Sequence, residues 1–166
     1  MTLRPEWIDI LEVLRDGEPA APRPSRRLRE RLLAATRQAS RFEGFVDRLA
    51  ALIGGTPDQA RQLVERIDRQ DTWVESTIPG HRFMPIQGHD AAAADVLEFV
   101  WVEAGWPFPT HSHQTDELSF CIQGGARMCE DLVLEPGDFL VTAAGKLHGG
   151  HSVDGEPCIM LLRRKT

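Results

Sequence analysis

Two histidines and a glutamate lie close together between Gly105 and Gly124, at the spacing H-x-H-x-x-x-E. Because alternate side chains of an extended strand point the same way, His111 and His113 are expected to share one face of a strand over 109–113. A turn through 114–116 then lets Glu117 begin the next strand and face them. Imidazoles and a carboxylate together are typical ligands of a divalent metal. His148 is the expected fourth ligand.

Three neutral imidazoles and one carboxylate leave a divalent ion with a net positive charge and open coordination positions. We expect one ion per chain, zinc or iron(II) first, with manganese and nickel as alternatives, because this ligand set suits all of them. The opposing interpretation is that these histidines are ordinary core or surface residues that match the pattern by chance. No catalytic residue and no organic cofactor site are predicted.

The strand that begins at Glu117 has a second set of inward side chains. Ser119, Cys121 and Gln123 alternate with apolar residues and are expected to share the face of Glu117. Cys121 either lines the metal pocket as an oxidisable thiol or is a small core residue.

The remaining histidines are weaker candidates. His151 is expected beside the metal ligands or at the pocket mouth, because it follows His148 closely. His81 and His89 precede the predicted barrel, so we expect them to be structural or exposed. The chain contains no tyrosine, so no tyrosyl hydroxyl can act as an acid or a base.

Composition places the chain among ordinary globular proteins. Its 166 residues are 42% hydrophobic and 27% charged, which suits one domain or one domain with a small companion. No apolar run is long enough for a membrane span, and the N-terminus lacks the apolar core of a signal peptide. Cys121, Cys129 and Cys158 are odd in number and are interpreted as reduced thiols of a cytoplasmic protein.

Charge and helical periodicity distinguish the first part of the chain. Residues 1–70 hold 13 Lys and Arg against 11 Asp and Glu, whereas residues 71–166 hold 6 against 14. Apolar spacing and capping signals predict about four short helices, over 5–15, 25–39, 40–53 and 56–67, with a proline-rich linker over 17–24. The last two helices form either an ordinary hairpin or a DNA-binding helix-turn-helix; we prefer the hairpin, because acidic residues share the exposed side.

From residue 71 the chain has a β pattern. Short β-branched and aromatic runs between glycine and proline turns predict nine strands, over 81–87, 96–102, 109–113, 117–123, 126–129, 132–134, 138–142, 147–153 and 158–163. Such closely spaced strands indicate a sandwich or a barrel. The predicted division is a helical region, 1–70, and a mainly β metal-binding domain, 71–166.

Two motifs resemble those of the cupin superfamily. The stretch from Gly105 to Gly124 is similar to the first cupin motif without a departure in spacing, and 137–152 is similar to the second. The second departs at Ala143, where the motif has proline, and at Ser152, where it has asparagine. The resemblance implies an antiparallel jelly-roll barrel with a metal ion held by His111, His113, Glu117 and His148.

A second resemblance, over about residues 25–165, is to the ChrR group of anti-sigma factors. It is carried by Arg29–Ala34, Arg41–Leu52, Pro57–Leu63 and Ile67–Trp73. Members join a zinc-binding anti-sigma domain to a cupin that senses oxidative stress. Residues 1–80 contain no histidine or cysteine, so the cupin half carries over and the zinc-binding half does not.

Three functions follow as hypotheses. The first is a sensor or regulatory module, with a small ligand or oxidant at the metal, a regulatory protein partner, and a homodimer as the resemblance implies. The second is a mononuclear non-haem iron(II) enzyme of the dioxygenase type. The third is a transcription regulator that combines a helix-turn-helix with a cupin.

Overall fold

The computed structural model describes Ser25 and residues 41–86, 95–128 and 132–165. The helices predicted over 5–15 and 25–39, the linker over 17–24, His89 and Cys129 lie outside the described residues. Within residues 39–166 the chain forms one compact unit. No helix of the described residues is long and apolar enough to cross a membrane.

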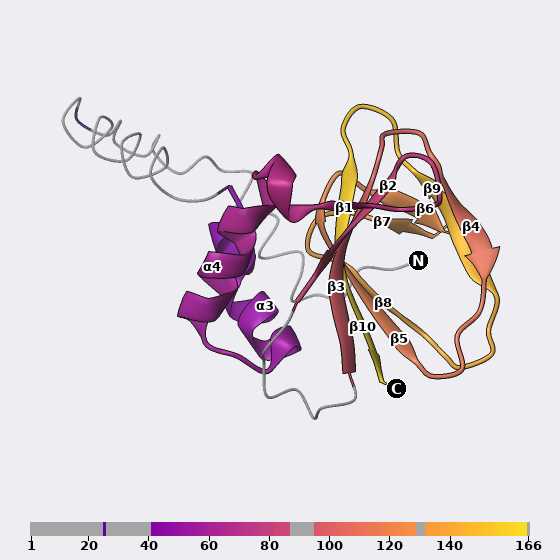
Figure 1. Ribbon diagram of the computed structural model, residues 1–166, viewed down its shortest axis with the longest axis horizontal. Coiled ribbons are helices and arrows are strands. Elements are labelled where there is room, and N and C mark those ends of the chain that lie inside the picture. The colour runs from indigo at the N-terminus through magenta and orange to yellow at the C-terminus, as the bar shows by residue number, and fades with distance from the viewer. Residues whose placement is uncertain (1–24, 26–40, 87–94, 129–131, 166) are drawn as a thin grey trace, which may run out of the picture. The chain divides into compact units, whose positions relative to one another are not determined.

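Two antiparallel sheets form the β part of this unit (Figure 1). The larger contains, in order, β1 (Val74–Glu75), β2 (His81–Pro85), β3 (Asp95–Val102), β10 (Cys158–Lys165), β5 (Glu117–Gln123) and β8 (Phe139–Thr142). The smaller contains β4 (Pro107–His111), β9 (His148–Ser152), β6 (Ala126–Met128) and β7 (Val133–Leu134). The prediction of a mainly β fold is confirmed.

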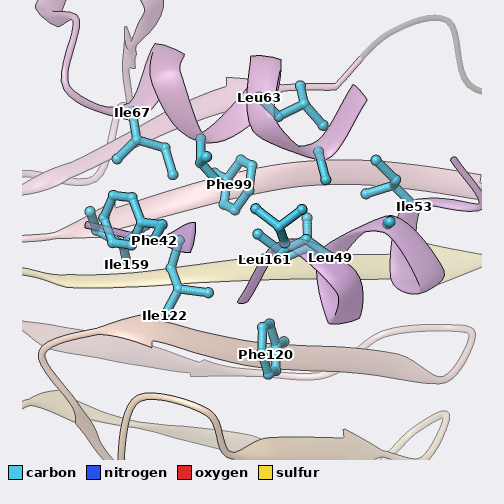
Figure 2. Packing of buried hydrophobic residues seen from close by; sticks show 14 of the residues in the cluster. Phe42, Leu49, Ile53, Leu63, Ile67, Phe99, Phe120, Ile122, Ile159 and Leu161 are labelled. Atoms are coloured by element: carbon cyan, nitrogen blue, oxygen red, sulfur yellow. The ribbon is translucent and has the colours of Figure 1, made fainter. Parts of the chain in front are cut away.

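Two helices cover the outer face of the larger sheet. These are α3 (Val46–Ile53) and α4 (Pro57–Ile67), with 3₁₀ turns η1 (Glu43–Phe45) and η2 (Gln70–Thr72) beside them. Their apolar stripes pack on alternate residues of the strands, and Figure 2 shows these side chains facing one another across the interface. The core they share contains Leu49, Ile53, Leu63, Ile67, Phe99, Phe120 and Leu161. The domain boundary predicted after residue 70 stays a prediction.

The capping signal that predicted a helix from residue 56 is confirmed as a capping box at the start of α4. Thr56 Oγ1 accepts from Gln59 N at 3.3 Å, and Gln59 Oε1 accepts from Thr56 N at 2.7 Å. The predicted start of the preceding helix is wrong, because residues 43–45 form a 3₁₀ turn and α3 begins at Val46. Gly54 ends α3 in the left-handed conformation at φ 67°, as expected for a glycine C-cap.

Alternation along β5 is confirmed, and it lets the strand contribute side chains to two separate cores, one on each face of the larger sheet. Leu118, Phe120 and Ile122 belong to or pack against the core with the helices. Cys121 belongs to a separate interior cluster with residues of β6, β7 and β10. Both faces of β5 are therefore buried, which the polar alternation alone did not predict.

The structure differs from the predicted strands in two places, of which the second concerns the site. The structure has an additional short strand, β1, that the sequence pattern did not indicate. β4 ends at His111, so His113 lies in the connection to β5 and not in the same strand. Shared strand geometry is therefore the wrong reason for expecting His111 and His113 to meet.

Candidate metal centre

Three histidines converge at one point of the β part, with His148 buried, His113 half-buried and His111 exposed. His111 and His148 are register partners on β4 and β9, and their ring centroids are 4.3 Å apart. His113 reaches the same point from the connection after β4, and its Nε2 lies 2.9 Å from Nε2 of His111. One ring nitrogen from each histidine lies within 4.8 Å of the others.

Glu117 adds a carboxylate to this cluster from the first position of β5. Its Oε2 lies 3.0 Å from His113 Nε2, and its Oε1 lies 3.8 Å from His148 Nε2. The residue is 2% exposed. The structure thus brings together all four side chains predicted as ligands; their role as ligands stays a prediction.

The donor atoms of this cluster fit a metal ion. Two ligand atoms about 2.1 Å from one ion lie about 3.0 Å apart when they subtend a right angle at it. The separations from His113 Nε2 to its two neighbours are close to this value. Glu117 Oε2 and His148 Nε2 are buried without a hydrogen-bond partner, which is costly unless a bound group satisfies them.

Backbone and side-chain contacts orient the rings. Pro109 O lies 2.7 Å from His111 Nδ1, so a proton on Nδ1 leaves the Nε2 lone pair directed at the cluster. Thr142 Oγ1 lies 3.5 Å from His148 Nδ1. The connection carrying His113 is fixed by Gly145 N, which donates to His113 O at 2.8 Å.

Burial favours the neutral forms of these groups. It lowers the pKa of His148 to about 4, and the nearby charges of His111 and His113 act in the same direction. Burial also lowers the pKa of His113, followed by the charge of His111. The pKa of Glu117 is raised by burial, which outweighs the opposing effect of Arg164. Neutral imidazoles are the form that binds metals.

Charged side chains from three neighbouring strands of the larger sheet lie beside the cluster. Arg164 on β10 is the register partner of Glu117, with Nε 3.7 Å from Glu117 Oε2. Its Nη2 donates to Glu98 Oε1 on β3 at 2.5 Å. The sequence signal for Arg164 is weak, because it lies far downstream of Glu117 and only strand pairing brings the two together.

The cluster opens into a cavity of about 330 Å³ inside the β part. Apolar side chains from β2, β3, β4 and β10 form most of its wall. His111, His113 and Glu117 line it, together with Glu98 and Arg164. A volume of this size is near the lower end of the range for small-molecule sites, about 300–1,000 Å³.

The two residues that depart from the second motif, Ser152 and Ala143, still form hydrogen bonds that hold the local turns. Ser152 is fully buried, and its Oγ donates to Glu103 O at 2.5 Å and accepts from Trp106 N at 3.1 Å. It thereby fixes the turn that leads into β4. Ala143 begins a turn in which Lys146 N donates to Ala143 O at 3.1 Å.

The other predicted candidates are distributed differently. Cys121 is fully buried in the apolar cluster, which agrees with the core interpretation, and neither it nor Cys158 forms a disulfide. His151 is exposed. His81 was expected to precede the barrel, but it lies in β2 of the larger sheet, is 4% exposed and lines the cavity.

Comparisons with known proteins agree with the fold of the β part. Residues 98–162 match the family model described as the cupin domain. No curated protein matches the chain. Among solved structures, the complex of SigE with the anti-sigma factor ChrR from Rhodobacter sphaeroides is similar at TM-score 0.58 and 19% identity, over 96% of this chain and 77% of that chain.

Two further solved structures share the fold. The polyketide cyclase RemF from Streptomyces resistomycificus aligns at TM-score 0.51 and 20% identity, over 60% of this chain and 75% of its own. An RmlC-like cupin protein from Ralstonia eutropha aligns at TM-score 0.50 and 21% identity, over 59% and 66%. Identities this low concern the fold alone. The family model thus matches residues 98–162, and the described part of the chain shares its fold with these structures.

Proposed function

We propose that this protein is a metal-binding cupin that acts as a sensor or regulatory module, with one divalent ion per chain. His111, His113, Glu117 and His148 would hold the ion, with zinc or iron first and manganese or nickel as alternatives. The observation that supports this most is the pair of buried atoms without partners, Glu117 Oε2 and His148 Nε2, beside two further ring nitrogens.

The ion would supply Lewis-acid chemistry, and redox chemistry if it is iron. The chain's own residues orient and shield the site. Burial keeps His148 neutral, Pro109 O sets the tautomer of His111, and apolar side chains form much of the cavity wall. A low-polarity setting strengthens the interaction of a small ligand or oxidant with the charges of the site.

Contacts between the site and the helices support the regulatory part of the proposal. Glu117 is followed on β5 by Phe120, whose ring packs edge-on against Phe45 at 5.8 Å. Arg163, next to Arg164, donates to Leu52 O of α3 at 2.9 Å. A change in ligation at Glu117 would therefore act on the packing of α3.

A protein partner and a ChrR-like role belong to the same proposal. The solved structure of ChrR is a complex with a sigma factor, and we propose that a regulatory protein reads the state of this site too. We also propose a homodimer.

Metal analysis combined with hydrogen exchange tests this function. Protein purified without added metal should contain about one divalent ion per chain, and His113→Ala should lose it. Chelation of the wild-type protein should increase amide exchange in α3. His151→Ala is the control for His113→Ala and should keep its metal, because this histidine is exposed and outside the cluster. Normal metal content in His113→Ala, or unchanged exchange in α3, would contradict the proposal.

An iron(II) enzyme of the dioxygenase type is the second candidate. It is favoured by the cavity of about 330 Å³, which gives a small substrate direct access to the histidine cluster. Oxygen uptake by iron-loaded protein with candidate substrates tests it. Substrate-dependent uptake that His113→Ala abolishes would replace the sensor proposal.

DNA binding through α3 and α4 is the third candidate, and the ion pairs of two arginines in and after α4 oppose it. Arg61 pairs with Glu43 at 2.9 Å and with Asp58 at 2.8 Å, and Arg69 pairs with Asp71 at 2.8 Å. These charges are compensated within the chain. A gel-shift experiment with genomic fragments should show no salt-sensitive complex.

A further inference from the structure

His81 is a buried histidine with one unused ring nitrogen. Its Nδ1 lies 2.9 Å from Pro79 O, and its ring packs edge-on against Phe108 with centroids 6.1 Å apart. Since a carbonyl oxygen only accepts hydrogen bonds, Nδ1 carries the proton of the neutral ring, and Nε2 is an acceptor. Nε2 is buried and has no hydrogen-bond partner. Such an atom needs a donor.

The cavity lined by His111, His113 and Glu117 also reaches His81. In the larger sheet, β3 and β10 lie between β2, which carries His81, and β5, which carries Glu117. The two residues are also offset along the sheet, because His81 pairs with Val102 whereas Glu117 pairs with Arg164, the partner of Val96. The cavity therefore has His81 at one side and the polar groups around Glu117, with Glu98 and Arg164, at another. The rest of its lining is apolar and consists of Ile78, Phe83, Val100, Phe108, Pro109 and Leu162.

The charges in the cavity favour an anion at the histidine cluster. Arg164 is already paired with Glu98 at 2.5 Å and lies near Glu117, so it offers no uncompensated charge. A divalent ion held by Glu117 and three neutral histidines would carry one net positive charge. A ligand with a single negative charge at that end would neutralise it.

We propose that this cavity binds an elongated organic anion whose charged group lies at the histidine cluster and whose remote hydroxyl donates to His81 Nε2. The anionic end rests on the proposed metal site, whereas the hydrogen bond to His81 does not. The flat side chains of Phe83 and Phe108 suit an aromatic body between the two polar ends. His81 thereby selects hydroxylated ligands over apolar ones of the same shape.

Calorimetric titration of zinc-loaded protein with paired probes tests this assignment. The hydroxylated probes are 4-hydroxybenzoate, 4-hydroxyphenylacetate and 4-hydroxycinnamate, and each is compared with the analogue that carries methyl in place of hydroxyl. At least one hydroxylated probe should bind about tenfold to a hundredfold more tightly than its analogue, because only it satisfies the buried acceptor. His81→Phe should abolish this preference, and the control His151→Phe should retain it.

Nitrogen NMR of the wild-type protein gives a second measurement that does not depend on the folding of a variant. The Nε2 resonance of His81 should move when the hydroxylated probe binds and stay in place with the methyl analogue. Three results would overturn the inference. These are equal affinities within every pair, no binding of any probe, and an Nε2 resonance of His81 that no probe shifts because a bound water satisfies this atom.

The two proposals fail in distinguishable ways. Zinc-loaded protein without hydroxyl preference overturns the role of His81 and leaves the metal site standing. Protein that takes up no divalent ion overturns the metal site. The NMR comparison in metal-free protein then decides the role of His81 alone.

Discussion

Replacing Glu117 with glutamine is expected to affect stability differently with and without metal. Glu117 is 2% exposed, and its Oε2 has no hydrogen-bond partner. In metal-free protein the substitution removes a negative charge that burial opposes, while Arg164 keeps its pairing with Glu98. We expect the free energy of unfolding at pH 7 to rise by about 1 kcal/mol or to remain unchanged.

In zinc-loaded protein the same substitution removes a proposed ligand. An ion present at a thousandfold excess over its dissociation constant stabilises the folded state by about 4 kcal/mol. A thousandfold loss of affinity in Glu117→Gln would remove most of this stabilisation, because each tenfold step is about 1.4 kcal/mol. The variant should therefore be less stable than wild type in zinc and at least as stable in chelator.

Urea denaturation in zinc and in chelator measures both effects. Glu135→Gln is the matched control, because it makes the same chemical change at an exposed position. The control should match the wild type in both conditions. Equal destabilisation of Glu117→Gln in zinc and in chelator would refute the reasoning, because it would assign Glu117 a structural role without a metal.

Three further predictions concern protonation, packing and backbone space. Burial lowers the pKa of His148 to about 4, so between pH 4 and the ordinary histidine pKa of 6.5 the unfolded state binds more protons than the folded state. The free energy of unfolding of metal-free protein should therefore fall by about 3 kcal/mol as the pH falls through this window. Urea denaturation of His148→Gln should lack this part of the pH dependence. Phe120→Ala should lower the free energy of unfolding by about 3–5 kcal/mol in the same assay while metal content stays near one ion per chain, because Phe120 packs on the helical side. Gly150→Ala should reduce metal content, because a Cβ there would collide with Arg127 O and displace β9, which carries His148. Gly44→Ala is the control and should leave metal content unchanged, because nothing lies within 4 Å of a Cβ at that position.

Local patterns in the sequence determined much of the β part. Glycine and proline turns delimited the strands, and eight-residue strands such as β3 and β10 follow their apolar runs closely. The inward alternation from Glu117 to Cys121 follows from strand geometry alone. The two motifs that resemble those of cupins also placed His111, His113, Glu117 and His148 in one group. The structure brings these residues together, although His113 reaches the others from a connection and not from a strand.

Other features depended on contacts between distant segments. The outer face of β5 is apolar because α3 and α4 cover it, which alternation within the strand does not reveal. Arg164 meets Glu117 through the register of β10 with β5, and His81 enters the cavity because β2 joins the same sheet. Periodicity fixes which face a side chain occupies, but strand order and register decide which residues share that face. The types of the site residues are therefore a property of the sequence, whereas the surroundings that select a ligand arise only from the tertiary structure.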